Sequence, residues 1–299
     1  MNILVVGSIA LDSVETPWGT AKDSPGGSAL YFSSAASYFA PVNIVGVVGT
    51  DFDFKGIDFL RQRTVNFEGI DQQEGLTFRW GGRYHRDLNQ RDTLFTHLNV
   101  FENFNPRIPE SYRSSDFVFL ANIDPDLQMQ VLRQIARPKL VILDTMNFWI
   151  TGKRNSLDEV IRQTDILILN DEEARLLTDT NNLISAGRII LERGPKYLII
   201  KKGEHGAVLM HENSYFSAPA YPLEKVVDPT GAGDTFAGGF VGYIARTGKI
   251  DEPTMRKAII YGSTIASFNV EDFSFRRLIS LKGEELEGRV QDFSRIITY

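Results

Sequence analysis

The chain of 299 residues contains no cysteine and only four histidines. Without cysteine, disulfides, thiolate metal sites and a thiol nucleophile are all excluded. The histidines, at positions 85, 97, 205 and 211, show no spacing typical of a zinc site. No apolar run approaches the length of a transmembrane helix, and the strand-like Ile3–Val6 follows Met1 so closely that we expect no signal peptide. These absences predict a cytoplasmic protein without a membrane partner.

Several widespread nucleotide and hydrolase motifs are also missing. The stretch from Gly242 to Lys249 has one residue too many for a Walker A loop, and Gly7–Asp12 lacks the glycine spacing of a dinucleotide fingerprint. No Gly-x-Ser-x-Gly elbow occurs. The formal net charge of -6 argues against nucleic acid as the main partner. A P-loop enzyme, a dinucleotide-dependent redox enzyme and a serine hydrolase are therefore all disfavoured.

Hydrophobic residues make up 42% of the chain, enough for one large α/β domain or two smaller ones. Short apolar runs, typical of buried strands, alternate with segments of helical periodicity. The runs lie at 3–7, 42–48, 117–120, 140–143, 166–169, 197–200 and 207–210, and the helical segments at 29–39, 127–136, 157–163, 172–177 and 185–193. This order predicts a doubly wound, mostly parallel sheet in a single domain spanning 1–299.

One segment interrupts this alternation. Residues 76–86 read as a β-hairpin with a two-residue turn at Gly81-Gly82, which would place Phe78, Trp80, Arg83 and His85 on one face. Such a mixed face suits a small β lid, built from about 12–25 and 74–98, that covers a cleft. A solvated surface hairpin is the alternative.

The most informative stretch is Val227–Phe236, where Gly-Ala-Gly precedes Asp234 and an apolar-periodic segment. This pattern indicates a loop that opens directly into an amphipathic helix. Small residues let main-chain amides approach a ligand, and the unpaired amides of a helix N-terminus bind anions such as phosphate. A carboxylate beside such an anion site is suited to phosphoryl transfer to an alcohol.

The motif resembles the C-terminal signature of the ribokinase/PfkB family of carbohydrate kinases, Asp-Thr-x-Gly-Ala-Gly-Asp, with Pro229 replacing the usual threonine. The resemblance implies that Asp234 is the catalytic base and that the amides of Gly231, Ala232 and Gly233 form the anion hole. It also implies a ribokinase-like fold with a small β lid. An ordinary glycine-rich loop capping a helix is the alternative interpretation.

Two N-terminal segments extend the resemblance. Asp12 follows the first strand and matches the family aspartate that binds sugar hydroxyls, although a turn-forming aspartate is common in its own right. Gly26 and Gly27 precede a helix and match the family's substrate-contacting glycine pair. Tyr31 replaces a family asparagine, which points away from a plain ribokinase; it could stack on the acceptor or simply face the core.

The nucleotide and metal candidates follow later in the chain. Asn170 and Glu173 match the family's Asn-x-x-Glu motif, which implies a role near the nucleotide phosphates and Mg²⁺, largely through water. The same residues also read as a helix N-cap with a favourable acidic first turn. The remaining nucleotide candidates implied by the resemblance are Lys202, Gly203, Gly206, Thr230 and Ser263. Asp228, with Thr230, matches positions that hold a monovalent cation such as K⁺ in some members.

We therefore expect an ATP- and Mg²⁺-dependent kinase that phosphorylates a hydroxyl of a sugar or sugar derivative. Arginines in the lid region, including Arg83, would suit an acidic acceptor, whereas its aromatic residues would suit a nucleoside base. A nucleoside kinase of the same family and a non-catalytic ligand sensor remain alternatives. The expected partner is a small sugar, polyol or nucleoside, and lid strands could pair two copies into a homodimer.

Overall fold

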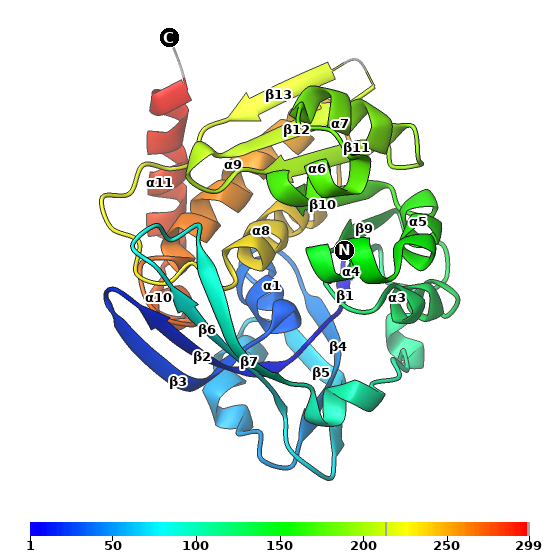
Figure 1. The fold of residues 1–299 in the computed structure, drawn as a ribbon, viewed down its shortest axis with the longest axis vertical. Coiled ribbons are helices and arrows are strands. Elements are labelled where there is room, and N and C mark those ends of the chain that lie inside the picture. The colour runs from blue at the N-terminus through cyan, green and yellow to red at the C-terminus, as the bar shows by residue number, and fades with distance from the viewer. Residues whose placement is uncertain (213, 298–299) are drawn as a thin grey trace.

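The computed structural model describes residues 1–212 and 214–297 and has a nine-stranded sheet at its centre (Figure 1). Its strands are β1 (Ile3–Val6), β4 (Val42–Gly49), β5 (Val65–Gln73), β8 (Phe117–Leu120), β9 (Leu140–Asp144), β10 (Ile166–Asn170), β11 (Tyr197–Lys201), β12 (Ala207–His211) and β13 (Ser214–Ala218). They lie in the order β13-β12-β11-β10-β9-β8-β1-β4-β5. Neighbours from β11 to β5 are parallel, and β12 and β13 add an antiparallel edge.

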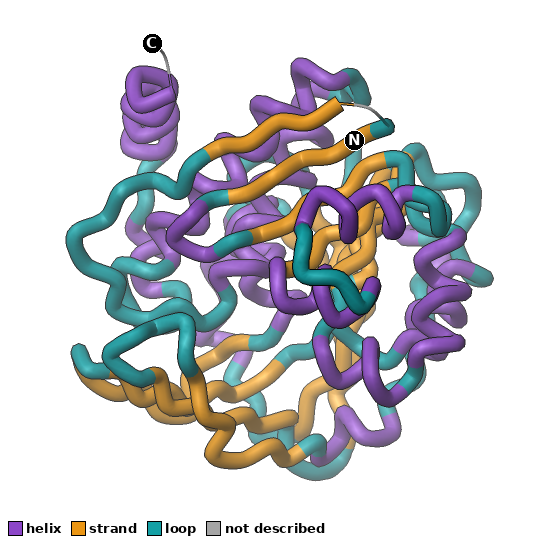
Figure 2. The backbone as a smooth tube through the Cα atoms, turned by 45° about the horizontal axis from the view of Figure 1, so that its top comes forward, coloured by secondary structure: helices purple, strands orange, loops and turns teal. Residues whose placement is uncertain are grey.

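Helices cover both faces of this sheet (Figure 2). They are α1 (Ser28–Ala36), α2 (Asp58–Gln62), α3 (Pro125–Leu132), α4 (Asn147–Gly152), α5 (Arg154–Arg162), α6 (Asp171–Thr178), α7 (Leu183–Leu191), α8 (Ala232–Thr247), α9 (Glu252–Asn269), α10 (Arg276–Ser280) and α11 (Gly283–Ile297). Short 3₁₀ turns occupy Phe54–Ile57, Asn99–Asn103, Glu110–Tyr112 and Gly203–His205.

The central strand β1 shows why the sheet is covered twice. Ile3 and Val5 belong to the core that contains α1, α8 and α9, whereas Leu4 and Val6 belong to the core that contains α3, α5, α6 and α7. A strand whose successive side chains all enter apolar cores has to be apolar throughout, which is what the sequence shows. The predicted doubly wound, mostly parallel fold is confirmed. Among the described helices, none has the length and apolarity needed to span a membrane.

A second, smaller sheet lies apart from the large one, at the lower left of Figure 1. Its strands are β2 (Ala10–Thr16), β3 (Gly19–Gly26), β6 (Phe78–Tyr84) and β7 (Arg91–His97), in the order β3-β2-β6-β7. The β2–β6 pair is parallel and the other two pairs are antiparallel. The small sheet expected from the sequence is therefore present, and its strands fall close to the segments 12–25 and 74–98. Its action as a lid, and the single-domain boundary, stay predictions.

The predicted turn at Gly81-Gly82 is wrong. Strand β6 runs straight through both glycines, and the hairpin turns at 85–90, where the His85 amide donates to the Gln90 carbonyl at 3.1 Å. The glycines make room for aromatic rings: a β-carbon on Gly82 would lie 2.1 Å from the Trp80 ring. One on Gly81 would lie 2.3 Å from the Phe95 ring. Close packing, and not a turn, accounts for the glycine pair.

Candidate active site

The first turn of α8 forms the centre of the site. Gly231 is its N-cap at φ 71°, and a β-carbon there would lie 2.2 Å from the ring of Tyr31 in α1. Only glycine fits this left-handed position under the ring. In the described part of the chain the amides of Gly231 and Gly233 donate to no other residue, whereas the Ala232 amide donates to the Pro229 carbonyl at 3.2 Å. Two of the three predicted anion-hole amides are thus available to a ligand.

Asp234 follows these amides in the same turn. Burial raises the pKa of its carboxyl from 3.8 to about 7; the nearby Asp144 raises it as well, and the Lys201 ammonium lowers it. Asp144 is the last residue of β9 and Lys201 the last residue of β11. The Lys201 ammonium donates a hydrogen bond to Asp144 Oδ2 at 3.3 Å. A carboxylate that titrates near neutral pH is matched to taking and returning a proton. Asp234 therefore stands directly beside the free amides of the glycine loop, as an acid–base group would need to.

Asp12 and the two N-terminal glycines come together as predicted. Asp12 lies on β2 and is 6% exposed, with Gly26 of β3 packed directly against it. A β-carbon on Gly26 would lie 2.0 Å from the Asp12 carboxylate, so glycine is required at this contact. Burial raises the pKa of Asp12 to about 7, although the Gly27 amide donates to it and lowers the pKa. Asp234 and Asp228 also raise the pKa of Asp12 electrostatically, which places all three carboxylates around one site.

The inner face of the small sheet supplies aromatic side chains to this site. Tyr84 is 8% exposed, and its hydroxyl lies 3.3 Å from the Thr230 hydroxyl beside the glycine loop. Tyr84 belongs to a small apolar cluster with Val14, Ala21 and Phe273, and Trp80 packs against it. The Arg91 guanidinium lies 5.0 Å from the centre of the Trp80 ring. Tyr31 is 2% exposed and packs on Phe275, so its ring faces the core side of the loop.

Arg91, and not Arg83, is the arginine that faces the site. Arg91 lowers the pKa of Asp12 and of Tyr84, so its charge lies close to both, although burial dominates and raises both pKa values. Arg83 points to the outer face of the small sheet and pairs with Glu15 at 2.7 Å. Strand β6 pairs with β2 in unbroken register from Phe78 to Arg83, so its side chains alternate, and Trp80 and Arg83 lie on opposite faces. The predicted face that grouped Trp80 with Arg83 is therefore wrong.

A cavity of about 700 Å³ has Gly233 in its wall. It is lined in part by the nucleotide candidates Gly203, Gly206 and Ser263, together with Lys201 and the lid turn 86–89. Asn89 of that turn closely approaches Gly203, since a β-carbon on Gly203 would lie 3.1 Å from its Oδ1. Lys202 is absent from the lining, so the lysine that the structure places in this cavity is its neighbour, Lys201.

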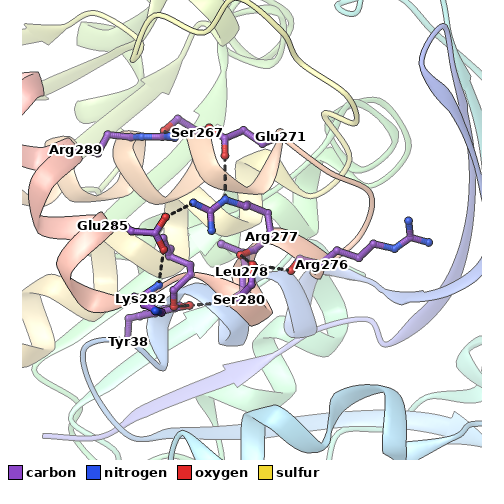
Figure 3. A network of polar contacts seen from close by, with 11 residues as sticks. Tyr38, Ser267, Glu271, Arg276, Arg277, Leu278, Ser280, Lys282, Glu285 and Arg289 are labelled. Carbon is purple, nitrogen blue, oxygen red and sulfur yellow. Dashed lines mark hydrogen bonds and ion pairs between the residues drawn. The ribbon is translucent and has the colours of Figure 1, made fainter.

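Ser267, which lines the cavity, belongs to a network of polar contacts (Figure 3). Arg289 of α11 donates to the hydroxyl of Ser267, a cavity-lining residue of α9, at 2.9 Å, and pairs with Glu271 at 2.7 Å. Glu271 also pairs with Arg277 of α10 at 3.1 Å. The network joins α9, α10 and α11, and no sequence motif predicts it.

Asn170 and Glu173 form a complete capping box at the start of α6. The Glu173 amide donates to Asn170 Oδ1 at 2.7 Å, and the Asn170 amide donates to Glu173 Oε2 at 2.7 Å. Glu173 is 7% exposed; burial raises its pKa to about 7, while Lys201 lowers it and Asp144 raises it. The helix-cap interpretation is therefore confirmed, and the carboxylate nevertheless stands among the charged groups of the site.

The chemistry of these carboxylates fits Mg²⁺. No group of three potential ligands among the described residues is close enough to enclose an ion by itself. Mg²⁺ is commonly held by one or two carboxylates, waters and the phosphates of a bound nucleotide, and Glu173 and Asp144 supply such oxygens. Asp228 lies in the loop before α8 and is 1% exposed. Its Oδ1 accepts a hydrogen bond from the Thr230 amide at 2.9 Å, which closes that loop.

Comparisons with known proteins match most of the chain. The model of the pfkB family carbohydrate kinases matches residues 3–279. A cytidine kinase of Thermococcus kodakarensis is 30% identical over 259 residues, which cover 84% of this chain and 91% of that protein. A nucleoside kinase of Methanocaldococcus jannaschii is 24% identical and covers 90% of each chain.

Solved structures show the same fold. A structure of a ribokinase II of E. coli in complex with ATP and Mg²⁺ superimposes with a TM-score of 0.78 at 20% identity, covering 97% of this chain and 99% of that one. The family match and the relatives together identify the class of enzyme as a phosphotransferase acting on carbohydrates or nucleosides. The chain belongs to the pfkB family of carbohydrate kinases.

Proposed function

We propose that the protein is an ATP-dependent nucleoside kinase that transfers the γ-phosphoryl group to a hydroxyl of its acceptor, with pyrimidine nucleosides such as cytidine as the first candidates. The observation that carries the proposal is the inner face of the small sheet, where Trp80 is the cross-strand partner of Asp12 and packs in one apolar cluster with Tyr84. The charge of Arg91 acts on Asp12 and on Tyr84. Aromatic rings and a guanidinium suit a planar base, and a carboxylate suits sugar hydroxyls. Two relatives named as nucleoside kinases support the same assignment.

Each part of the site has a role in this reaction. Asp12, with Gly26 and Gly27 packed around it, would accept hydrogen bonds from the acceptor's hydroxyls. Asp234 would take the proton of the reacting hydroxyl as its oxygen attacks the γ-phosphorus and the bond to the β-phosphate oxygen breaks. The free amides of Gly231 and Gly233 would donate to the phosphoryl oxygens as negative charge redistributes over them.

The 700 Å³ cavity is the proposed nucleotide site, with Gly203, Gly206 and Ser263 in its wall. Glu173, through water, and Asp144 would hold Mg²⁺, which when bound neutralises charge on the phosphates. The structure of the E. coli ribokinase II with ATP and Mg²⁺ supports this choice of cofactors. A K⁺ site at Asp228, and pairing of two copies through an edge of the small sheet, remain predictions.

A sugar kinase is the second candidate, because the family includes carbohydrate kinases and Asp12 needs only hydroxyls as partners. The deciding experiment measures ADP release with Mg²⁺ and ATP across nucleosides, free sugars, sugar acids and polyols. We expect the highest kcat/KM for a nucleoside. A higher value for ribose or a sugar acid would reject the nucleoside proposal. Binding of acceptor and ATP with no turnover for any compound would favour the sensor alternative.

A further inference from the structure

Lys201 is a buried cation at a position that the family resemblance does not assign. It is the last residue of β11 and stands in register with Asn170, the last residue of β10. Its side chain is only 18% exposed, and its Nζ lies 3.3 Å from Asp144 Oδ2. Burying a long flexible side chain costs conformational entropy and desolvation, so a buried ammonium needs compensating partners.

The ammonium points at the start of α8. A β-carbon on Gly233 would lie 2.9 Å from Lys201 Nζ, so the amine nearly touches the residue whose amide is free. Lys201 and Gly233 also line the same 700 Å³ cavity. The amine, the free amide and the cavity therefore meet at one point, and Asp234 is the next residue along the chain. An anion placed there would contact the ammonium and the helix terminus together.

Lys201 places a positive charge in the wall of the cavity. Its ammonium pairs with Asp144 at 3.3 Å, and the same side chain lines the cavity beside Gly233. Among the described residues that line the cavity, only Lys201 and Arg86 are basic, and Arg86 lies on the exposed lid turn. Lys201 is therefore the buried positive charge that the polyphosphate of a nucleotide would meet beside the reacting group.

We propose that Lys201 is a further catalytic residue, whose ammonium binds the γ-phosphoryl group beside the Gly233 amide while that group moves to the acceptor. The inference rests on the proposed kinase function. The reacting proton passes from the hydroxyl to Asp234, one phosphorus–oxygen bond forms and the bond to the ADP oxygen breaks. Lys201 stays protonated throughout and contributes charge and N–H donors.

A purely structural role makes a different prediction. If Lys201 only ties β11 to β9 through Asp144, its loss would lower stability and weaken all nucleotides alike. If it contacts the γ-phosphoryl group, its loss would weaken ATP far more than ADP, because only ATP carries that group. The difference in affinity between the two nucleotides therefore separates the two roles without any need for turnover.

The test compares Lys201→Met with Lys257→Met, which removes an exposed charge of α9 outside the cavity. Calorimetry with Mg²⁺ would measure the Kd of ADP and of a non-hydrolysable ATP analogue, and steady-state assays would give kcat and KM. For Lys201→Met we expect the analogue to bind about tenfold or more weakly, ADP less than about threefold more weakly, and kcat to fall about 10²- to 10³-fold. Lys257→Met should match the wild type.

Equal weakening of both nucleotides, or a normal kcat, would overturn the proposal. If Lys201→Met does not fold, Lys201→Arg is used instead, because it keeps the positive charge but replaces the compact ammonium by a planar guanidinium. It should then bind both nucleotides within about threefold of the wild type while losing at least about tenfold in kcat. An Arg variant with wild-type kcat would count against a positioned ammonium. Failure of the wild type to phosphorylate any acceptor would reject the kinase proposal, whereas the binding comparison would still decide the role of Lys201.

Discussion

Replacing Asp234 by Asn should abolish turnover and at the same time make the protein more stable. The two changes share a cause, because the carboxylate is held in a site that disfavours its charge. Burial and the nearby Asp144 raise the pKa of Asp234 to about 7. Asn has nearly the same shape without the charge, so the variant loses the proton acceptor and also the cost of keeping an anion there.

The size of the gain follows from the two pKa values. The carboxyl ionises near 3.8 in the unfolded chain and near 7 in the folded protein. Between these values the folded state binds more protons, so this group's contribution to stability falls as pH rises from about 4 and is fully lost above about 7. The upper bound is about 4 kcal/mol at 1.36 kcal/mol per unit. We expect about 1–4 kcal/mol for Asp234→Asn at pH 8, and roughly 2 °C in Tm per kcal/mol for a chain of this size.

The assay is thermal unfolding of both proteins at pH 5 and pH 8, combined with kcat under saturating substrates. The stabilisation should be largest at pH 8 and less than about half as large at pH 5, and kcat should fall by at least about 10³-fold. Asp116→Asn is the matched control, because a hydrogen bond from Lys139 lowers the pKa of Asp116 and its loss should lower Tm at pH 8. A less stable Asp234→Asn protein, or one with near-normal turnover, would contradict the assignment of Asp234 as a base whose charge is disfavoured by burial.

Further predictions concern other parts of the site. Arg91→Gln should raise the acceptor KM about tenfold, whereas Arg83→Gln should leave it unchanged, because only Arg91 faces Asp12; steady-state kinetics with varied acceptor check this. Gly231→Ala should lower Tm by several degrees and reduce kcat at least about 10²-fold, since a β-carbon would lie 2.2 Å from a tyrosine ring; equal Tm values would argue against the close packing. Glu173→Gln keeps the capping box but should raise the Mg²⁺ concentration for half-maximal rate about tenfold, measured by Mg²⁺ titration.

The large sheet was accessible from the sequence because its signals are local. Short apolar runs such as Phe117–Leu120 favour buried strands, and Gly231 through Asp234 before an apolar-periodic segment favours a helix start; both are observed. Asp12 and Gly26 were predicted from their places near the first strand and the first helix, and the structure brings them together on β2 and β3 of the small sheet. Their roles toward a ligand stay predictions.

The inner face of the small sheet and the position of Lys201 could not be predicted from the sequence, because they depend on packing and register. Gly81-Gly82 fits a hairpin turn equally well until the Trp80 and Phe95 rings that fill the space above the glycines are known. Lys201 and Lys202 are adjacent, so only the position at which β11 ends decides which one points into the cavity. One feature of the sequence did point to Lys201. Asp144, Asn170 and Lys201 are the last residues of the neighbouring strands β9, β10 and β11.

Phosphorus NMR of a reaction containing the wild-type protein, Mg²⁺, ATP and cytidine tests the proposed function at the level of the bond that forms. We predict a phosphomonoester signal from the nucleoside that grows as the ATP γ-phosphate signal disappears, with ADP formed in equal amount. The Asp234→Asn protein should bind ATP and give neither change. A product that carries no phosphate on the nucleoside, or the same product at an undiminished rate with Asp234→Asn, would contradict the account.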